Sequence, residues 1–92
     1  IMKIKVRNMV SDKGNDIANQ FIITTDKGRY FQSYDSVIAF IPFGNKPTQI
    51  DKNYWDYSKT TGKYRNLFLR ERKPETEQKI ADKIYKLTDL NK

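Results

Sequence analysis

The chain has 92 residues, which suffice for one domain but leave too few for a second hydrophobic core. It carries 18 Lys and Arg against 11 Asp and Glu, a net charge of +7, and it contains neither Cys nor His. These counts exclude disulfides, thiolate nucleophiles, zinc–thiolate sites, imidazole bases and imidazole metal ligands.

Apolar and cationic residues alternate at the start of the chain. A period of two is typical of a strand that buries one face and turns the other to water. We therefore predict a strand whose buried residues are Met2, Ile4 and Val6 and whose water-facing cations are Lys3, Lys5 and Arg7. Residues 11–16 (SDKGND) are turn formers and end this element.

A β-hairpin follows the turn. Residues 18–25 and 29–34 are rich in β-branched and aromatic side chains, and Asp26-Lys27-Gly28 between them suits a three-residue loop. Alternation along the second strand predicts one face shared by Tyr30, Gln32 and Tyr34.

An uncharged run, residues 37–43 (VIAFIPF), predicts a strand covered on both faces and ending near Pro42. A helix is the competing interpretation, because so short an apolar run has no distinguishing period. Residues 48–50 favour a brief further strand.

The second half of the chain has helical spacing. Ser58 suits an N-cap, and Gly62, which costs ~1 kcal/mol relative to Ala, predicts an irregular first turn. The apolar face of this helix consists of Thr61, Tyr64, Leu67 and Phe68.

A second helix is predicted to begin at Pro74 and to turn Ile80 and Ala81 inward, before a last strand within residues 84–88. The expected fold is a single α+β domain over residues 1–92. It has an antiparallel sheet of four or five strands, with two short helices before the last strand.

Positive charge is concentrated within residues 59–73, which contain six basic side chains and one acid, Glu71. Trp55, Tyr64 and Phe68 lie beside or among them, and such a mixture neutralises phosphates and stacks bases. The alternative is that the cations form a solvated face and the rings belong to the core. The candidate residues for binding nucleic acid or a partner are Lys59, Lys63, Arg65, Arg70, Arg72 and Lys73, assisted by Lys3, Lys5 and Arg7.

The sequence offers little for catalysis. Asp35, Asp51 and Asp56 are the acids of the central region, but their spacing does not require them to converge on a metal, as a nuclease needs. Residues 60–63 (TTGK) lack the two-glycine frame of a P-loop. We therefore expect no enzyme activity, no catalytic or metal-binding residues and no cofactor.

Six segments carry a resemblance that covers nearly the whole chain. They are residues 19–23 (NQFII), 30–36 (YFQSYDS), 55–58 (WDYS), 60–66 (TTGKYRN), 68–69 (FL) and 87–91 (LTDLN). In these the chain resembles a family of small uncharacterised proteins encoded by phages and integrated mobile elements of Gram-positive bacteria. Lys83 departs from the pattern, since a glycine turn is expected there.

The resemblance implies a small accessory protein in the cytoplasm of a bacterial host. Short, non-enzymatic phage proteins often bind nucleic acid, and we take this as the first hypothesis, with DNA, RNA or a nucleoprotein as the partner. The second is a protein-binding inhibitor of a host defence system such as a CRISPR nuclease (an anti-CRISPR). At +7 the chain cannot mimic DNA. No membrane partner is expected, because no apolar run approaches the ~18 residues of a membrane span and the Lys-rich amino terminus lacks a signal-peptide core.

Overall fold

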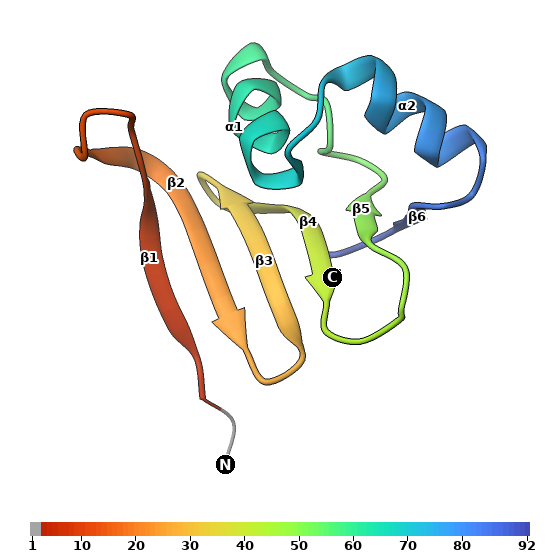
Figure 1. Cartoon of the computed structure of the whole chain (residues 1–92), viewed down its shortest axis with the longest axis horizontal. Coiled ribbons are helices and arrows are strands. Elements are labelled where there is room, and N and C mark those ends of the chain that lie inside the picture. The colour runs from red at the N-terminus through yellow and green to blue at the C-terminus, as the bar shows by residue number, and fades with distance from the viewer. Residues whose placement is uncertain (1–2) are drawn as a thin grey trace.

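Six strands form one sheet, and two helices cover one of its faces in the computed structural model, which describes residues 3–92 (Figure 1). The strands follow one another in sequence order across the sheet, β1-β2-β3-β4-β5-β6. The elements are β1 (Lys5–Val10), β2 (Asp16–Thr25), β3 (Gly28–Ser33), β4 (Ser36–Pro42), β5 (Gln49–Asp51), α1 (Lys59–Leu69), α2 (Lys73–Ala81) and β6 (Lys86–Thr88).

The predicted α+β class is confirmed, but the sheet has six strands where four or five were expected. Both of the short segments form strands, because β5 pairs with β4 and with β6. That pair is parallel, whereas the other four pairs are antiparallel as expected. The two helices supply the crossover connection that a parallel pair requires.

The alternation at the start of the chain was interpreted wrongly for the apolar residues. Ile4 and Val6 are 59% and 62% exposed, and Met2 lies outside the described residues. The reason is that β1 is an edge strand, two strands away from β3, which α1 contacts. Val6 also lies on the sheet face that carries no helix, whereas Met9, farther along β1, packs against the core.

The predicted hairpin forms from β2 and β3, and residues 36–42 form the strand β4 and not a helix. Tyr30 and Gln32 share a face as predicted, but Tyr34 does not extend it. Tyr34 has a left-handed backbone (φ 54°) and lies in the turn between β3 and β4.

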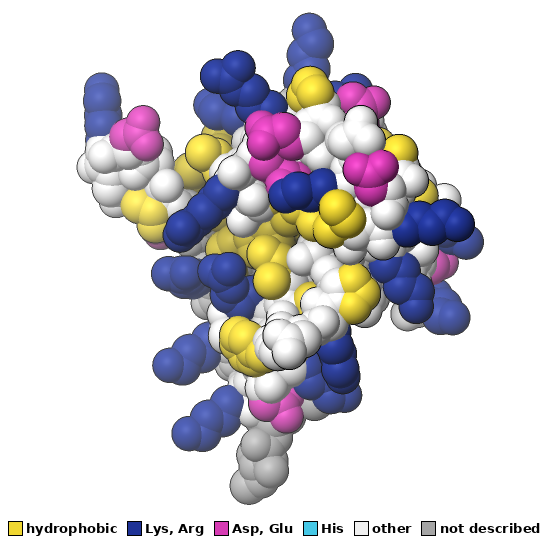
Figure 2. Space-filling model, turned by 45° about the vertical axis from the view of Figure 1, so that its right-hand side comes forward, with side chains coloured by type: hydrophobic (Ala, Val, Ile, Leu, Met, Phe, Trp, Pro, Cys, Tyr) yellow, Lys and Arg dark blue, Asp and Glu magenta, His cyan; other side chains and the backbone are white. Residues whose placement is uncertain are grey.

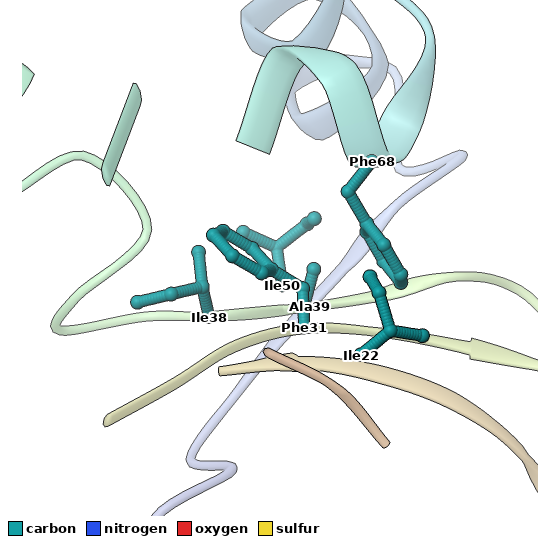
Figure 3. Packing of buried hydrophobic residues seen from close by; sticks show 6 residues of the cluster. All are labelled: Ile22, Phe31, Ile38, Ala39, Ile50 and Phe68. Atoms are coloured by element: carbon teal, nitrogen blue, oxygen red, sulfur yellow. The ribbon is translucent and has the colours of Figure 1, made fainter. Parts of the chain in front are cut away.

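The core lies between the sheet and α1 (Figure 3). Phe31 is fully buried, and its ring centroid is 5.7 Å from that of Phe68 of α1. Trp55 and Tyr64 pack against this cluster while half-buried. The buried apolar residues of the cluster are Ile22, Phe31, Ile38, Ala39, Ile50 and Phe68.

Register assigns the residues of the strands to the two faces. Phe31 and Ser33 contact α1 and so define the helix-side face, with the Ser33 and Thr61 hydroxyl oxygens 2.9 Å apart. One cross-strand row on this face is Arg7, Ile22, Phe31, Ala39 and Ile50. The neighbouring row on the other face, which carries no helix, is Val6, Ile23, Tyr30, Phe40 and Gln49.

The first helix is regular from Lys59 onward, so the expected irregularity at Gly62 is wrong. Ser58 is the N-cap, as predicted, and its Oγ accepts a hydrogen bond from the Thr61 N–H at 3.1 Å. Gly62 is buried against the guanidinium of Arg65, 3.6 Å from where a Cβ would lie. Tertiary packing thus offsets the low helix propensity of glycine.

The second helix begins at Lys73, one residue before the predicted start, with Pro74 in its first turn. Ile80 packs against the core as predicted, but Ala81 is exposed because it ends the helix on the solvent side. Lys83 has φ 60°, the left-handed conformation that the expected glycine turn would supply.

A buried carboxylate joins the two helices to the last strand. Glu71, whose side chain is 3% exposed, accepts hydrogen bonds from Thr76 Oγ1 at 2.6 Å, Lys79 Nζ at 2.7 Å and Tyr85 Oη at 2.8 Å. It therefore fixes α2 and the approach to β6 relative to the end of α1.

Candidate functional site

Arg65, one of the six predicted cations of residues 59–73, is an internal residue. It is 1% exposed, and its Nη1 donates to the Trp55 carbonyl oxygen at 2.6 Å and to Asp56 Oδ1 at 3.2 Å. Its Nη2 donates to Asn66 Oδ1 at 3.1 Å, and its Cζ lies 5.1 Å from the Trp55 ring centroid. The expected contact with a phosphate does not fit a guanidinium with this burial and these partners.

Asp56 holds a second predicted cation. Lys73 Nζ lies 2.6 Å from Asp56 Oδ2, so this carboxylate neutralises charge from both Arg65 and Lys73. Burial alone would raise the pKa of Asp56, but hydrogen bonds from Lys73 and Arg65 outweigh it and hold the pKa below its ordinary value. Lys73 is accordingly less available to an external anion than its exposure suggests.

The other four cations of this segment are exposed and lie in three places. Lys59 and Lys63 line a hollow beside Asp56. Arg70 ends α1 as its C-cap, in the left-handed conformation (φ 58°), and Arg72 is the N-cap of α2. The nine predicted residues therefore do not form one patch, and Figure 2 shows Lys and Arg side chains on several sides of the molecule.

The cations of β1 lie on the helix-side face of the sheet. Lys5 pairs with Thr24, and Thr24 pairs with Arg29 of β3, so the two cations lie on the same face, two strands apart. Two inter-strand spacings separate them by about 10 Å. Arg7 lies in the next row along, and Lys3 lines a hollow with Lys5 and Thr24.

The direction of α1 brings its carboxyl end toward these cations. Thr61, near the start of α1, contacts Ser33 at the end of β3, whereas Arg29 near the start of β3 has its Cζ 5.8 Å from the Phe68 ring centroid. The helix therefore runs antiparallel to β3, and Arg70 lies toward the Arg29 end of the sheet.

The side of α1 that carries Lys63 is directed toward the hairpin formed by β1 and β2. Lys63 and Leu67 line one hollow together with Val10 and Ile17. Five cations from β1, β3 and α1 surround the part of the helix-side face that α1 leaves open. We call them the basic surface: Lys5, Arg7, Arg29, Lys63 and Arg70. Figure 2 shows Lys and Arg side chains along the left edge, the side on which Figure 1 places β1.

None of the five cations of the basic surface forms an ion pair within the described part of the chain. Within residues 3–92, the ion pairs are Arg65–Asp56, Lys73–Asp56 and Lys79–Glu71, and none of them includes a member of this surface. Asp12 lines a hollow with Lys63 and Asp26 lines another with Lys5, but neither acid pairs with that lysine. The five positive charges are thus available to an external anion.

The acids considered for a nuclease are placed apart. Asp35 is exposed in a turn, and Asp51 is buried at the end of β5, where it accepts backbone hydrogen bonds from Asn53, Tyr54 and Leu90. Within the part of the chain that the structure describes, no group of three acidic residues is arranged to hold a metal ion.

Comparison with known proteins places the chain in a family. Residues 4–85 match a family described as a family of unknown function (DUF8033). The chain belongs to this family. No curated protein and no solved structure matches it. The phage or mobile-element origin that the sequence resemblance implies stays a prediction.

Two features of this DUF8033 member were missed from its sequence. The first is Arg29 as a member of the basic surface, because β3 contains no other charged residue to draw attention to it. Only the pairing of β1 with β2, and of β2 with β3, brings Arg29 near Lys5 and Arg7. The burial of Arg65 was missed as well, because its spacing matches that of the exposed cations.

Among residues 3–92 no helix is both long and apolar enough to cross a membrane.

Proposed function

We propose that this protein is a non-enzymatic accessory protein that binds nucleic acid, or a nucleoprotein, through the basic surface. The observation that carries the proposal is the convergence of five cations, from three elements, on a side without a paired carboxylate. We expect it to act in the cytoplasm of a bacterial host.

The arrangement favours contacts with phosphates. Cations on an edge strand and on the adjoining helix neutralise a backbone without reading base edges, and such binding is strongly salt-dependent. Arg29, half-buried over the Phe68 ring, is held more rigidly than the surrounding lysines. We therefore expect affinity without strong preference for sequence.

The first test reverses two exposed charges of the basic surface, as Arg7→Glu with Lys63→Glu. At 50 mM salt we expect affinity for DNA or RNA to fall by about 10- to 100-fold, and the slope of log affinity against log salt to become shallower by about 2. Fluorescence anisotropy titrations over a series of salt concentrations measure both quantities.

Lys83→Glu with Lys86→Glu is the matched control, because it makes the same change of charge at two exposed positions near the opposite edge of the sheet. Its affinity is expected to stay close to that of the wild type. Wild-type binding that ignores salt, or no binding at micromolar protein in low salt, would reject the proposal.

A second test separates binding from stability. Arg70 and Lys83 both adopt the left-handed conformation (φ 58° and 60°), which glycine accepts without steric cost. We expect Arg70→Gly and Lys83→Gly each to raise the free energy of unfolding by up to ~1 kcal/mol. Only Arg70→Gly should weaken binding, by severalfold. Urea unfolding and anisotropy on the same samples provide both readings, and equal affinities for the two variants would remove Arg70 from the basic surface.

A pull-down from phage-infected cells treated with nuclease addresses the alternative function. Recovery of a host defence protein in the absence of nucleic acid would favour the protein-binding inhibitor. In that case charge reversal in the basic surface should matter only where the face of the partner is acidic.

A further inference from the structure

The sheet face opposite the helices carries a continuous uncharged row across its strands. Val6, Ile23, Tyr30, Phe40 and Gln49 follow one another in register from β1 to β5. Both helices pack on the other face, so this row is covered by neither. A partly exposed row of uncharged side chains on a small, strongly charged domain favours a binding role.

Aromatic rings are stacked at one place in this row. The Tyr30 and Phe40 ring centroids are 4.2 Å apart and the two planes are inclined by 19°. Phe40 is 8% exposed, whereas Tyr30 is half-buried and forms the outer ring of the stack. The close approach of Gly28 accommodates this arrangement, because a Cβ there would lie 2.8 Å from Phe40 Cε1 and 2.4 Å from the Ile41 carbonyl oxygen.

A third ring stands beside the stack and faces solvent. Phe43 follows β4 and is 55% exposed, and its N–H donates to the Lys27 carbonyl oxygen at 3.0 Å, which ties the loop after β4 to the turn between β2 and β3. Tyr30, Phe40 and Phe43 line a hollow of about 420 Å³, within the range of sites for small ligands.

The charges around this hollow favour an anionic, planar ligand. Lys27 and Lys46 line it, against a single acid, Asp26, and Gln49 adds a neutral amide that can both donate and accept hydrogen bonds. Rings that accept a base, with lysines to neutralise its phosphate, are the elements of single-strand recognition. A protein partner would use the uncharged row but would gain less from the lysines.

We propose that a nucleobase of a single-stranded nucleic acid stacks in this hollow against Tyr30 and Phe43, while Lys27 and Lys46 contact the flanking phosphates. The inference rests on the proposed function, since it assumes that the anionic partner is a nucleic acid. It adds a second surface and a preference for unpaired strands, because a base within a duplex cannot leave its stack without cost.

Phe43→Ala is the test, because removal of an exposed ring leaves the core intact. Anisotropy titrations with a fluorescent single-stranded oligonucleotide and with a duplex of equal length compare the wild type with this variant. We expect Phe43→Ala to lower affinity for the single strand by about 5- to 100-fold and to leave affinity for the duplex unchanged. Phe43→Trp keeps a ring and should retain binding. Tyr54→Ala, which removes an exposed ring elsewhere, is the matched control.

The outcomes separate the two proposals. A wild type that binds the duplex but not the single strand, or equal single-strand affinity in Phe43→Ala and wild type, overturns this inference alone. Binding of neither nucleic acid overturns both. A wild type that is dimeric by sedimentation and becomes monomeric with Phe43→Ala assigns the hollow to a second copy of the chain, and this also overturns the inference.

Discussion

Replacing Arg65 by Ala is expected to lower the free energy of unfolding by about 3–5 kcal/mol. The guanidinium is 1% exposed and donates to the Trp55 carbonyl oxygen, Asp56 and Asn66. Its removal takes this donor from the Trp55 carbonyl oxygen and from Asn66, leaves Asp56 paired with Lys73 alone, and opens a cavity beneath Gly62, where the side chain now packs. Each effect is destabilising in a buried position.

Chemical denaturation with urea measures this loss, and Lys63→Ala in the same helix is the control. Lys63 is exposed, so its removal should change the free energy of unfolding by no more than about 0.5 kcal/mol. Arg65→Lys should recover only part of the stability, because an ammonium cannot reproduce the planar fork of donors. A loss below 1 kcal/mol for Arg65→Ala would mean that this buried network contributes little to the fold.

Removing the carboxylate of Glu71 is expected to lower the free energy of unfolding by about 2–4 kcal/mol in Glu71→Ala. The carboxylate accepts from Thr76, Lys79 and Tyr85, and Thr76 is fully buried. Glu71→Gln retains an acceptor and should lose less. Glu77→Gln, on the exposed side of α2, is the control and should stay close to the wild type.

The same carboxylate should make stability depend on acid pH. Burial alone would raise the pKa of Glu71, but hydrogen bonds from Lys79, Thr76 and Tyr85 outweigh it and hold the pKa below its ordinary value of 4.5. A lowered folded-state pKa stabilises the fold above the ordinary value, and this contribution is lost as the pH falls through the folded-state pKa. Glu71→Gln should therefore lose less stability than the wild type when the pH is lowered from about 5. Glu71→Gln should still lose some stability at acid pH, because the pKa of Asp56 is also lowered in the folded protein.

Tyr85 extends this dependence to alkaline pH. Burial and the hydrogen bond to Glu71 raise its pKa from 10.0 to about 12. A raised folded-state pKa means that the contribution is complete below pH 10 and is lost as the pH rises toward 12. Thermal unfolding followed between pH 9 and 12 should show this decline in the wild type and a flatter profile in Tyr85→Phe. Identical profiles would place the alkaline transition elsewhere in the molecule.

Local patterns predicted most of the elements of this fold. The hairpin of β2 and β3, the strand β4 and the Ser58 cap depend on neighbouring residues, so the sequence identifies them. The parallel pairing of β5 with β6 was missed because each strand has only three residues and the pairing depends on the path of the two helices. The burial of Ile4 and Val6 was predicted wrongly because the alternation along β1 does not show which face of the sheet α1 covers or how far across the sheet it extends.

The candidate site was predictable only in part. Lys5, Arg7, Lys63 and Arg70 were named from charge and spacing alone, because exposure is the usual state of such residues. Arg65 has the same charge and a similar position in the helix, and only the fold around the Trp55 carbonyl shows that it is internal. Charge density in a sequence thus does not separate a cation that holds the fold from one that contacts a ligand.

The pairing of β5 with β6 has a consequence for how the chain folds during synthesis. Strands β1 to β4 join neighbours in sequence, so they can pair as they leave the ribosome. The outer edge of β5 must wait until residues 86–88 have emerged, after both helices, and an unpaired edge recruits strands from other molecules. The three residues of β6 therefore cover the outer edge of β5. We expect a nascent chain interrupted before them to aggregate more readily than a chain that includes β6.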